Sequence, residues 1–325
     1  MRQTRNLLYP SGYRGFESLS LRHFLWLLLF ACVPAVAQQP PSGAPQIGQP
    51  SRDSVWVPTP ERVMRRMLQM ADTTRRDVVV DLGSGDGRIP IYAAKHFGAR
   101  AIGVELEANL VALSREKATA EGVSHLASFI QQDLFEADLA RATVIALYIS
   151  PGVMSRLKPR LLELNPGTRI VSHQFTLEDW APDETIRVEN RTAHLWVVPA
   201  SVAGHWSVEL PGESFLLGLE QRYQALSATG ERDGSSLAVI GLNLRGTEIW
   251  FTAFDRDGSV RHFRGAVQGA RMTGDSEGEG TPLRWSARRV QPKVSASPDS
   301  QCAAAPRLWN RRTLTPRFIA ACSAK

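Results

Sequence analysis

The chain has 325 residues, and 43% of them are hydrophobic, which suits one α/β domain of ordinary size together with a smaller second unit. This composition excludes a chain that is disordered throughout. The formal charge is +6, yet residues 1–37 carry +3 and residues 291–325 carry +5, so residues 38–290 carry −2. Because this body lacks a basic excess, we expect no nucleic-acid partner.

The three cysteines are Cys32, Cys302 and Cys322, and all of them lie in the terminal segments. The body of the chain can therefore form neither a disulfide framework nor a Cys-x-x-Cys metal site. We expect a protein without a bound metal.

Residues 1–37 have the charge, apolar core and small residues that are typical of a secretory signal. Arg22-His23 leads into an apolar run over 24–33, and Ala35-Val36-Ala37 follows. The run is too short to span a bilayer comfortably, so we expect no integral membrane span.

This signal-like segment predicts a periplasmic or envelope-associated protein. If the segment does not act as a signal, a cytoplasmic protein is expected. Residues 1–20 do not fit the signal pattern, and we expect translation to begin near Leu19 or Leu21.

Residues 38–54 are rich in Gln, Pro, Gly and Ser and show no apolar period, which is typical of a linker. Over residues 55–200, segments with helical spacing alternate with short β-branched runs. The alternation predicts a mostly parallel sheet with helices on both faces. The expected helices lie at 63–71, 88–97, 108–121 and 153–164, and the expected strands at 77–82, 101–105, 127–132, 143–148, 169–175 and 195–199.

After residue 200 the pattern changes to short apolar runs separated by turns that carry Gly, Asp and Ser, as in hairpins. We expect a small C-terminal all-β domain over 201–290, closed by Trp285, with its aromatic side chains in the core rather than on a binding surface. Residues 291–325 are rich in Pro, Ser and Ala, which is typical of a disordered tail. The expected strands lie at 206–210, 215–219, 237–244, 248–254 and 263–267.

A glycine-rich loop, Asp81-Leu82-Gly83-Ser84-Gly85-Asp86-Gly87-Arg88, joins an expected strand to an expected helix. At such a junction, glycines let backbone N–H groups and the helix N-terminus approach a nucleotide-like ligand closely. A dinucleotide site or a plain tight turn gives the same pattern, so the loop alone leaves these alternatives open.

Two carboxylates follow the next two strands. Glu105 ends one strand, where it can accept hydrogen bonds from both ribose hydroxyls of a ligand. Asp133 follows the other, where it can accept from an adenine amine while Leu134 packs against the ring. Each acid alone is also explained as a solvated loop residue or a helix cap. The ordered set Asp81, Glu105 and Asp133 resembles the cofactor signature of the class I S-adenosylmethionine-dependent methyltransferases.

Over roughly residues 55–200, the sequence also resembles the bacterial and archaeal relatives of the ATP synthase c-subunit lysine methyltransferase. The stretches that carry this likeness are Val57-Pro58-Thr59-Pro60, residues 81–88, Asp133-Leu134-Phe135-Glu136-Ala137-Asp138-Leu139, Leu147-Tyr148-Ile149-Ser150-Pro151, Pro166-Gly167-Thr168-Arg169 and Ser172-His173. The resemblance implies a Rossmann-like seven-stranded methyltransferase sheet, S-adenosylmethionine as the cofactor, and N-methylation of a lysine. Ile149-Ser150 stands where the family usually has two aliphatic residues, which weakens the inferred substrate more than the inferred fold.

Three residues are the catalytic candidates: Tyr148, Pro151 and His173. Tyr148 and Pro151 stand at the end of a strand, where amine methyltransferases often carry Asn/Asp-Pro-Pro-aromatic and where a ring and backbone carbonyls can orient an amine toward a sulfonium. A core tyrosine explains Tyr148 equally well. His173 ends the next strand and can orient water or substrate, with a hydrogen-bonded structural histidine as the alternative.

The expected cofactor-binding residues are Thr59, Asp81, Gly83, Ser84, Gly85, Gly87, Glu105, Asp133 and Leu134. Thr59 is included through the family resemblance alone, because Pro58-Thr59-Pro60 is otherwise simply a good helix start. No strong base is required for a lysine acceptor, since a desolvated pocket beside a cationic sulfonium lowers the pKa of its amine.

We expect a protein-lysine N-methyltransferase first. A small-molecule N- or O-methyltransferase is the second hypothesis, because class I folds reuse one cofactor half for many acceptors. The third is an exported, non-catalytic binding protein with a methyltransferase-like domain. The complete set of Gly83, Gly85, Glu105 and Asp133 argues against this third hypothesis.

Overall fold

The computed structural model describes residues 57–254, 258–278 and 281–291. The chain divides into two compact units, Met1–Ala44 and Pro45–Lys325, and every described residue belongs to the second. The signal-like segment, the expected linker and all but the first residue of the expected tail lie outside the described residues. Within the described part, none of the helices has the length and apolarity that a membrane crossing requires.

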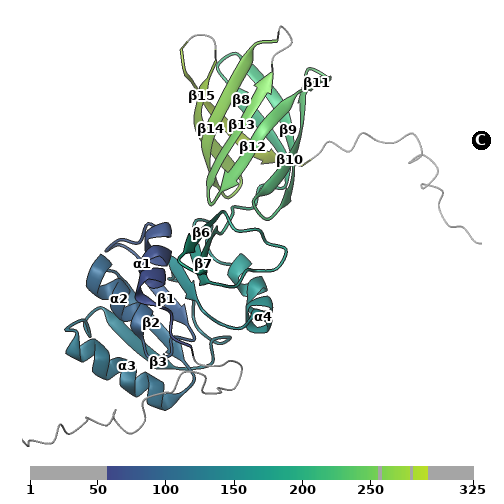
Figure 1. The fold of residues 1–325 in the computed structure, drawn as a ribbon. Coiled ribbons are helices and arrows are strands. Elements are labelled where there is room, and N and C mark those ends of the chain that lie inside the picture. The colour runs from purple at the N-terminus through teal and green to yellow at the C-terminus, as the bar shows by residue number, and fades with distance from the viewer. Residues whose placement is uncertain (1–56, 255–257, 279–280, 292–325) are drawn as a thin grey trace, which may run out of the picture. The chain divides into compact units, whose positions relative to one another are not determined.

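The α/β domain contains a seven-stranded sheet with the order β3-β2-β1-β4-β5-β7-β6 (Figure 1). Strands β1 to β5 are parallel, and β7 lies antiparallel between β5 and β6. The strands are β1 (Val78–Leu82), β2 (Arg100–Glu105), β3 (Ala127–Gln131), β4 (Val144–Leu147), β5 (Arg169–His173), β6 (Glu184–Val188) and β7 (Arg191–Val197). The helices are α1 (Glu61–Met70), α2 (Arg88–Phe97), α3 (Ala108–Ala120) and α4 (Pro151–Leu162). This arrangement confirms the predicted Rossmann-like α/β fold.

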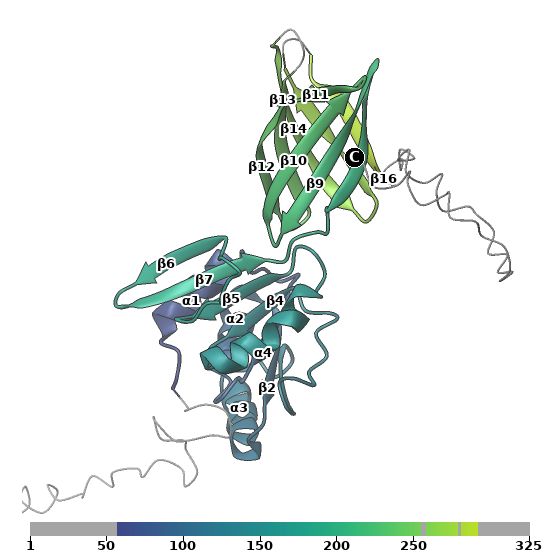
Figure 2. The same ribbon diagram turned by 90° about the vertical axis from the view of Figure 1, so that its right-hand side faces the viewer.

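Alternate residues of the central strands pack against different helices, because successive side chains of a strand point to opposite faces. Val80 and Leu82 share a core with Met154 of α4, whereas Val79 shares a core with Met67 of α1. Figure 2 shows α4 on one face of the sheet and α1 and α2 on the other. β4 is buried along its whole length, as expected for a parallel strand covered on both sides.

The sheet ends in the hairpin β6–β7, which the sequence pattern predicts only in part. The expected strand at 195–199 overlaps the end of β7, and β6 is not predicted. β6 is an edge strand with the sequence Glu-Thr-Ile-Arg-Val, and all of its residues are exposed or half-buried, so it has no apolar face to recognise. Because His173 pairs with Ala193, the N-terminal end of β7 lies beside the C-terminal end of β5.

The β domain is a single antiparallel sheet with the order β11-β10-β9-β8-β16-β15-β14-β13-β12. β10 also contacts β12, and the sheet curls into a barrel (Figures 1 and 2). The strands are β8 (Gly204–Leu210), β9 (Glu213–Arg222), β10 (Ala225–Arg232), β11 (Ser235–Leu237), β12 (Val239–Arg245), β13 (Glu248–Phe254), β14 (Val260–Gln268), β15 (Arg271–Glu277) and β16 (Leu283–Val290). The sequence pattern does not predict β10 and β15, because small and polar residues dominate both.

Five aromatic side chains of the described β domain are buried, which confirms the prediction of an aromatic core: Trp206, Phe215, Phe251, Phe263 and Trp285. The rings of Phe251 and Phe263 stack with their centroids 4.5 Å apart. Trp285 meets both rings edge-on at 5.6 and 5.7 Å. Two other aromatic side chains of the domain, Trp250 and Phe254, are half-buried.

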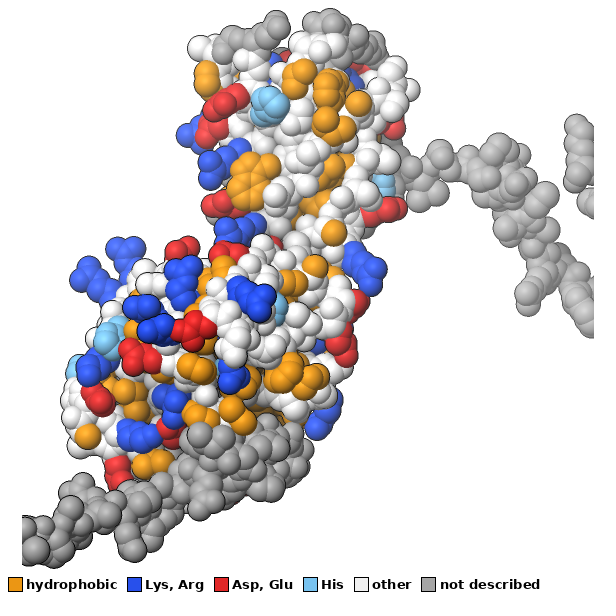
Figure 3. Space-filling model, viewed as in Figure 1, with side chains coloured by type: hydrophobic (Ala, Val, Ile, Leu, Met, Phe, Trp, Pro, Cys, Tyr) orange, Lys and Arg blue, Asp and Glu red, His pale blue; other side chains and the backbone are white. Residues whose placement is uncertain are grey.

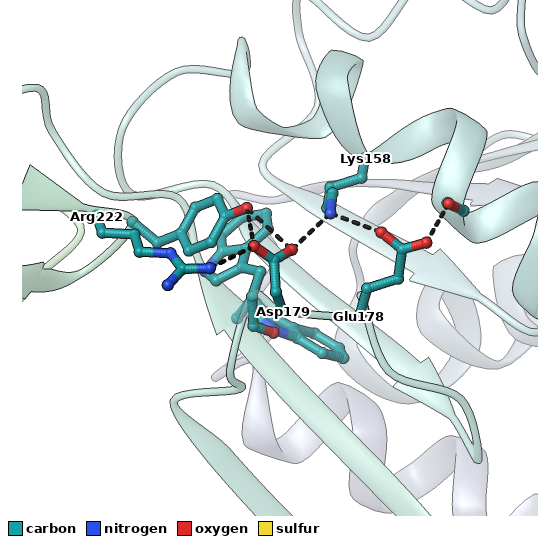
Figure 4. A network of polar contacts seen from close by, with 8 residues as sticks. Lys158, Glu178, Asp179 and Arg222 are labelled. Carbon is teal, nitrogen blue, oxygen red and sulfur yellow. Dashed lines mark hydrogen bonds and ion pairs between the residues drawn. The ribbon is translucent and has the colours of Figure 1, made fainter.

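A polar network joins the loop after β5 to the turn after β9 (Figure 4). The carboxylate of Asp179 accepts hydrogen bonds from Lys158 at 2.7 Å, from Arg222 at 2.9 Å and from the Tyr223 hydroxyl at 3.0 Å. Beneath it, the fully buried indole of Trp180 stacks on the Tyr223 ring and donates to the Gln224 side chain at 2.9 Å. Exposed ion pairs contribute little on their own, so the buried indole is the stronger part of this contact.

Candidate active site

A cavity lies at the C-terminal ends of β1, β2 and β4, where the loops of a parallel sheet meet. Most of the predicted cofactor residues line it: Thr59, Asp81, Gly83, Ser84, Gly85, Glu105, Asp133 and Leu134. Tyr148 lines the same cavity, and the other two catalytic candidates, Pro151 and His173, do not. The cavity therefore joins the predicted cofactor residues to one of the predicted acceptor residues.

The glycine-rich loop turns through three left-handed residues, Gly83, Gly85 and Gly87, with φ of +78°, +54° and +75°. Gly87 does not line the cavity. A Cβ atom at Gly87 would lie 2.6 Å from the Phe129 ring and 2.7 Å from Ser114, so this glycine is required for close packing against α3 and β3. Gly87 also stands at the N-cap of α2, and its predicted cofactor role stays a prediction.

Glu105 fixes the shape of the loop. Its Oε2 accepts a hydrogen bond from the Gly85 N–H at 2.8 Å, and its Oε1 accepts from the N–H groups of Leu106 at 2.8 Å and Glu107 at 3.0 Å. Each carboxylate oxygen can accept more than one hydrogen bond, so the group can still accept from a ligand hydroxyl. The carboxylate is thus oriented before any ligand binds.

The pKa values of two further carboxyl groups in the loop are shifted in opposite directions. Asp81 is buried, and this burial, followed by the neighbouring charges of Glu105 and Asp86, raises its pKa well above the usual range. Asp86 is also buried, but hydrogen bonds and charge from Arg88 and Lys117 outweigh the effect of burial and lower its pKa. Asp86 is therefore a structural anion, whereas Asp81 lacks a cationic partner among the described residues.

Asp133 and Leu134 stand where the sequence pattern puts them, directly after β3. Asp133 Oδ1 accepts a hydrogen bond from the Phe135 N–H at 3.0 Å, so the residue also shapes its own turn. Leu134 is half-buried and packs on the core that lies under α4.

The chemistry of this cavity fits S-adenosylmethionine. The buried Asp81 carboxyl suits the positive charge of the cofactor, and Glu105 has acceptor capacity for a ribose diol. A Cβ atom at Gly83 would lie 3.1 Å from the Ile149 side chain, and the φ of +78° there also disfavours any residue but glycine. Leu134 and Val104 supply apolar walls for an adenine ring.

Tyr148 lines the cavity and contacts aromatic rings from the end of β5 and the residues after it. Tyr148 lies directly after β4, and its ring is 3.9 Å from the ring of His173, the last residue of β5. The Phe175 ring is stacked with Tyr148 at a centroid distance of 6.2 Å. The Thr59 hydroxyl, just before α1, lies 3.3 Å from Nδ1 of His173. The phenol that borders the cavity is therefore packed against two rings.

His173 is fully buried. Desolvation, with a further effect from the positive charge of Arg191, lowers its pKa to about 4. The imidazole is thus neutral near pH 7, and its Nε2 has no hydrogen-bond partner among the described residues. A group with this pKa is a weak base, so its position behind Tyr148 favours packing and orientation over proton transfer.

Pro151 is the first residue of α4, after Ser150 at the N-cap, and it is exposed. Proline suits this position because its fixed φ matches the helix and its missing N–H is not needed there. Its place in the structure is explained by the start of the helix.

The cavity is also lined by residues that are not among the predicted cofactor-binding or catalytic residues. They are Val57, Pro58, Asp86, Arg88, Ile89, Val104, Leu106, Glu107, Leu110, Gln132, Ile149 and Val153. Most of them adjoin predicted site residues, so their signal is proximity along the chain. Arg191, by contrast, reaches Tyr148 across 43 residues and has no sequence signal at all.

Comparisons with known proteins agree with this site. Residues 81–184 match the model of the ANTKMT methyltransferase domain family. The protein-lysine N-methyltransferase of Saccharolobus islandicus is 44% identical over 149 residues, which cover 44% of this chain and 92% of the relative.

Two vertebrate relatives match over a smaller share of their length. The ATP synthase c-subunit lysine N-methyltransferase of Xenopus laevis is 37% identical over 39% of this chain and 56% of its own. The adenine nucleotide translocase lysine N-methyltransferase of Mus musculus is 40% identical over 32% of this chain and 46% of its own. The chain thus spans about half the length of these relatives.

Among solved structures, an RNA methyltransferase from Salinibacter ruber in complex with S-adenosylhomocysteine is 49% identical. It covers 45% of this chain and 96% of its own, with a TM-score of 0.44. The archaeal relative is matched over nearly its whole length, and the family model covers the glycine-rich loop, Glu105 and Asp133. The chain therefore belongs to the family of the protein-lysine N-methyltransferase of Saccharolobus islandicus and is an S-adenosylmethionine-dependent methyltransferase.

Proposed function

We propose that the protein transfers a methyl group from S-adenosylmethionine to the ε-amine of a lysine in a protein. The observation that carries the proposal is the neutral, buried His173 behind Tyr148. A hydroxyl acceptor needs a base near neutral pH, and a histidine with a pKa of about 4 is too weak to act as one. An amine needs only to lose its proton to solvent before it reacts.

S-adenosylmethionine supplies an electrophilic methyl group on a sulfonium. The chain's residues arrange the acceptor: the Tyr148 ring borders the cavity, and the apolar side chains of Ile149 and Val153 exclude water beside it. Desolvation lowers the pKa of an entering amine and so raises the fraction with a free lone pair. The new C–N bond forms as the C–S bond breaks, which leaves S-adenosylhomocysteine and a methylated ammonium group.

The names of the relatives support a protein lysine as the acceptor. One is a protein-lysine N-methyltransferase, and two others act on a lysine of the ATP synthase c-subunit or of an adenine nucleotide translocase. On the face of the α/β domain seen in Figure 3, basic and acidic side chains are interspersed. A mixed surface of this kind suits a protein partner better than a nucleic acid. The signal-like segment adds envelope proteins to the candidate acceptors.

The test incubates the full chain with tritiated S-adenosylmethionine and separate envelope and soluble extracts of the source cells. We expect label in a protein band that protease removes and ribonuclease does not, with methyl-lysine found after acid hydrolysis. A Glu105→Ala variant provides the background, and a Glu116→Ala variant, altered on the exposed face of α3, provides the matched control. Label that appears only in small molecules, or that ribonuclease removes, would refute the proposal.

A further inference from the structure

Arg191 is placed at the acceptor side of the cavity by the register of the sheet. It is the first residue of β7, which runs antiparallel to β5, and the Gln174 N–H just beyond β5 donates to the Thr192 carbonyl at 2.8 Å. The start of β7 therefore lies at the sheet edge where β4 and β5 end. From there the guanidinium Nη1 of Arg191 lies 3.5 Å from the Tyr148 hydroxyl, at the long end of a hydrogen bond.

The charge of Arg191 is not paired with a carboxylate among the described residues. Its neighbour Glu189, in the β6–β7 turn, forms an ion pair with Arg62 of α1 instead. Arg88 of α2 pairs with Asp86, and His173 of β5 is neutral. Glu61 and Arg65 of α1 line the same cleft as Arg191, and neither forms an ion pair with it in the described part of the chain. Arg191 thus places a positive charge without an ion-pair partner beside Tyr148.

Arg191 also lines a second, open cleft. The cleft lies between the start of α1 and the β6–β7 turn, and its lining includes Pro60, Arg62, Arg65 and Asn190. Tyr148 lines the cofactor cavity, and Arg191 touches Tyr148 while lining this cleft. The pair therefore forms the boundary between the cofactor cavity and a route by which an acceptor chain can approach.

We propose that Arg191 is a positioning residue for the acceptor amine. It donates a hydrogen bond to the Tyr148 oxygen, and the second lone pair of that oxygen accepts one N–H of the amine. This contact points the nitrogen lone pair toward the methyl group. The unpaired charge of Arg191 also disfavours a protonated amine at the same place, so the neutral form binds selectively. Neither Arg191 nor Tyr148 gains or loses a proton in the transfer. The inference rests on the proposed methylation of an amine.

The test uses the full chain and a bisubstrate analogue. In this analogue a nitrogen replaces the sulfur of S-adenosylhomocysteine. A short linker joins it to the nitrogen of an n-butylamine arm, so that this second nitrogen stands for the ε-amine of a lysine and the butyl chain for its side chain. Dissociation constants are measured by calorimetry at pH 7 and pH 9 for the analogue, for the same nitrogen analogue with a methyl group in place of the arm, and for S-adenosylhomocysteine. The ratio of the first two isolates the contribution of the arm. The variants are Arg191→Met, Arg191→Lys and, as a matched control on the same hairpin, Arg187→Met.

In the wild-type protein, the arm should bind more tightly at pH 9 than at pH 7, by up to about 100-fold, because the neutral fraction of an amine rises tenfold per pH unit below its pKa. Arg191→Met should reduce this gain at least tenfold, since the protonated arm is then tolerated, and should weaken the binding of the neutral arm. Arg191→Lys should keep the pH dependence because it keeps the charge. Arg187→Met and the binding of S-adenosylhomocysteine should not change.

Two failures can be told apart. If the arm adds nothing to affinity in the wild-type protein at either pH, the amine site is absent and the proposed function fails. If the arm binds with its pH dependence in both the wild type and Arg191→Met, only the role of Arg191 is overturned. A loss of S-adenosylhomocysteine affinity in Arg191→Met but not in Arg187→Met would assign Arg191 to cofactor binding and would also overturn the inference.

Discussion

Gly85 and Glu105 are joined by a hydrogen bond of 2.8 Å between the backbone N–H of the loop and the carboxylate at the end of β2. The same carboxylate accepts from two further N–H groups of its own loop, at Leu106 and Glu107. One side chain thus orients the glycine-rich loop and the ends of two neighbouring strands. Because it is held from three directions, its contribution to cofactor binding extends beyond direct contact with a ribose.

Replacing Glu105 should therefore strongly reduce the affinity for the cofactor. Glu105→Ala removes the acceptor of three backbone N–H groups, and hydrogen bonds to a charged group contribute about 1.5–3 kcal/mol each. We expect the affinity for S-adenosylhomocysteine to fall at least about 100-fold in calorimetric titrations. Glu105→Gln, which keeps one carbonyl oxygen, should lose less. Glu116→Ala should bind as the wild type does, and an unchanged affinity in Glu105→Ala would contradict the assignment.

Asp81 should make cofactor binding and stability depend on pH. Its raised pKa means that the folded protein holds the proton more tightly than the unfolded chain, whose pKa is near 3.8. Stability is then greatest below pH 3.8 with respect to this group, and it falls as the pH rises from that value through the folded pKa. Asp81→Asn cannot ionise, so its melting temperature should exceed that of the wild type by a margin that grows with pH over this window.

The same carboxyl should release its proton when a cationic cofactor binds, because a positive charge nearby favours the ionised form. Calorimetry with S-adenosylmethionine in buffers of different ionisation enthalpy should detect this release in the wild type. Asp81→Asn should show none. An equal buffer dependence in both proteins would assign the proton to another group.

His173 should act on stability in the opposite direction at low pH. Its folded pKa of about 4 lies below the unfolded value of 6.5, so the neutral form is the one that the fold stabilises. The associated stability is complete above pH 6.5 and is lost as the pH falls from 6.5 through 4, by up to about 3 kcal/mol. Denaturation curves of the wild type and His173→Gln should therefore converge as the pH falls across this range. A His173 NMR resonance, identified by its loss in His173→Gln, that titrates near 6.5 would contradict the assignment.

Trp180 should dominate the contact between the loop after β5 and the turn after β9. The indole is fully buried, and truncation of such a side chain costs about 3–5 kcal/mol, so Trp180→Ala should lower the free energy of unfolding by this amount. Trp180→Phe keeps a ring but loses the hydrogen bond to Gln224, for a loss nearer 1 kcal/mol. Asp179→Ala removes only exposed ion pairs and should have a much smaller effect in the same denaturation experiment. A larger effect from Asp179→Ala than from Trp180→Ala would reverse this order.

The central strands of the α/β domain can be predicted from sequence because both of their faces are buried. β4 has the sequence Val-Ile-Ala-Leu, and this uninterrupted apolar run distinguishes it from a loop. The edge strand β6 and the barrel strand β10 give no such signal, since exposed and half-buried residues alternate along β10 without an apolar run. The cavity residues Asp81, Glu105 and Asp133 are predictable for a related reason, because residues at or just after the carboxyl ends of parallel strands reach the same edge of the sheet.

The acceptor side is harder to predict because it depends on pairing between distant segments. Tyr148 and His173 end parallel strands and can be found from their positions. Arg191 begins an antiparallel strand, and only the register of β7 against β5 brings it to the same edge. Nothing in the local sequence around Arg191 encodes that register.

The antiparallel course of β7 also separates two tasks that a single sheet edge must perform. The glycine-rich loop and Glu105 lie at the ends of β1 and β2. The β6–β7 hairpin lies on the other side of β4 and β5 in the sheet, and among the described residues it forms no hydrogen bond with the loop or with Glu105. Exchange of residues 184–197 between relatives is therefore a modular route to altered acceptor preference that leaves the methyl-donor half intact.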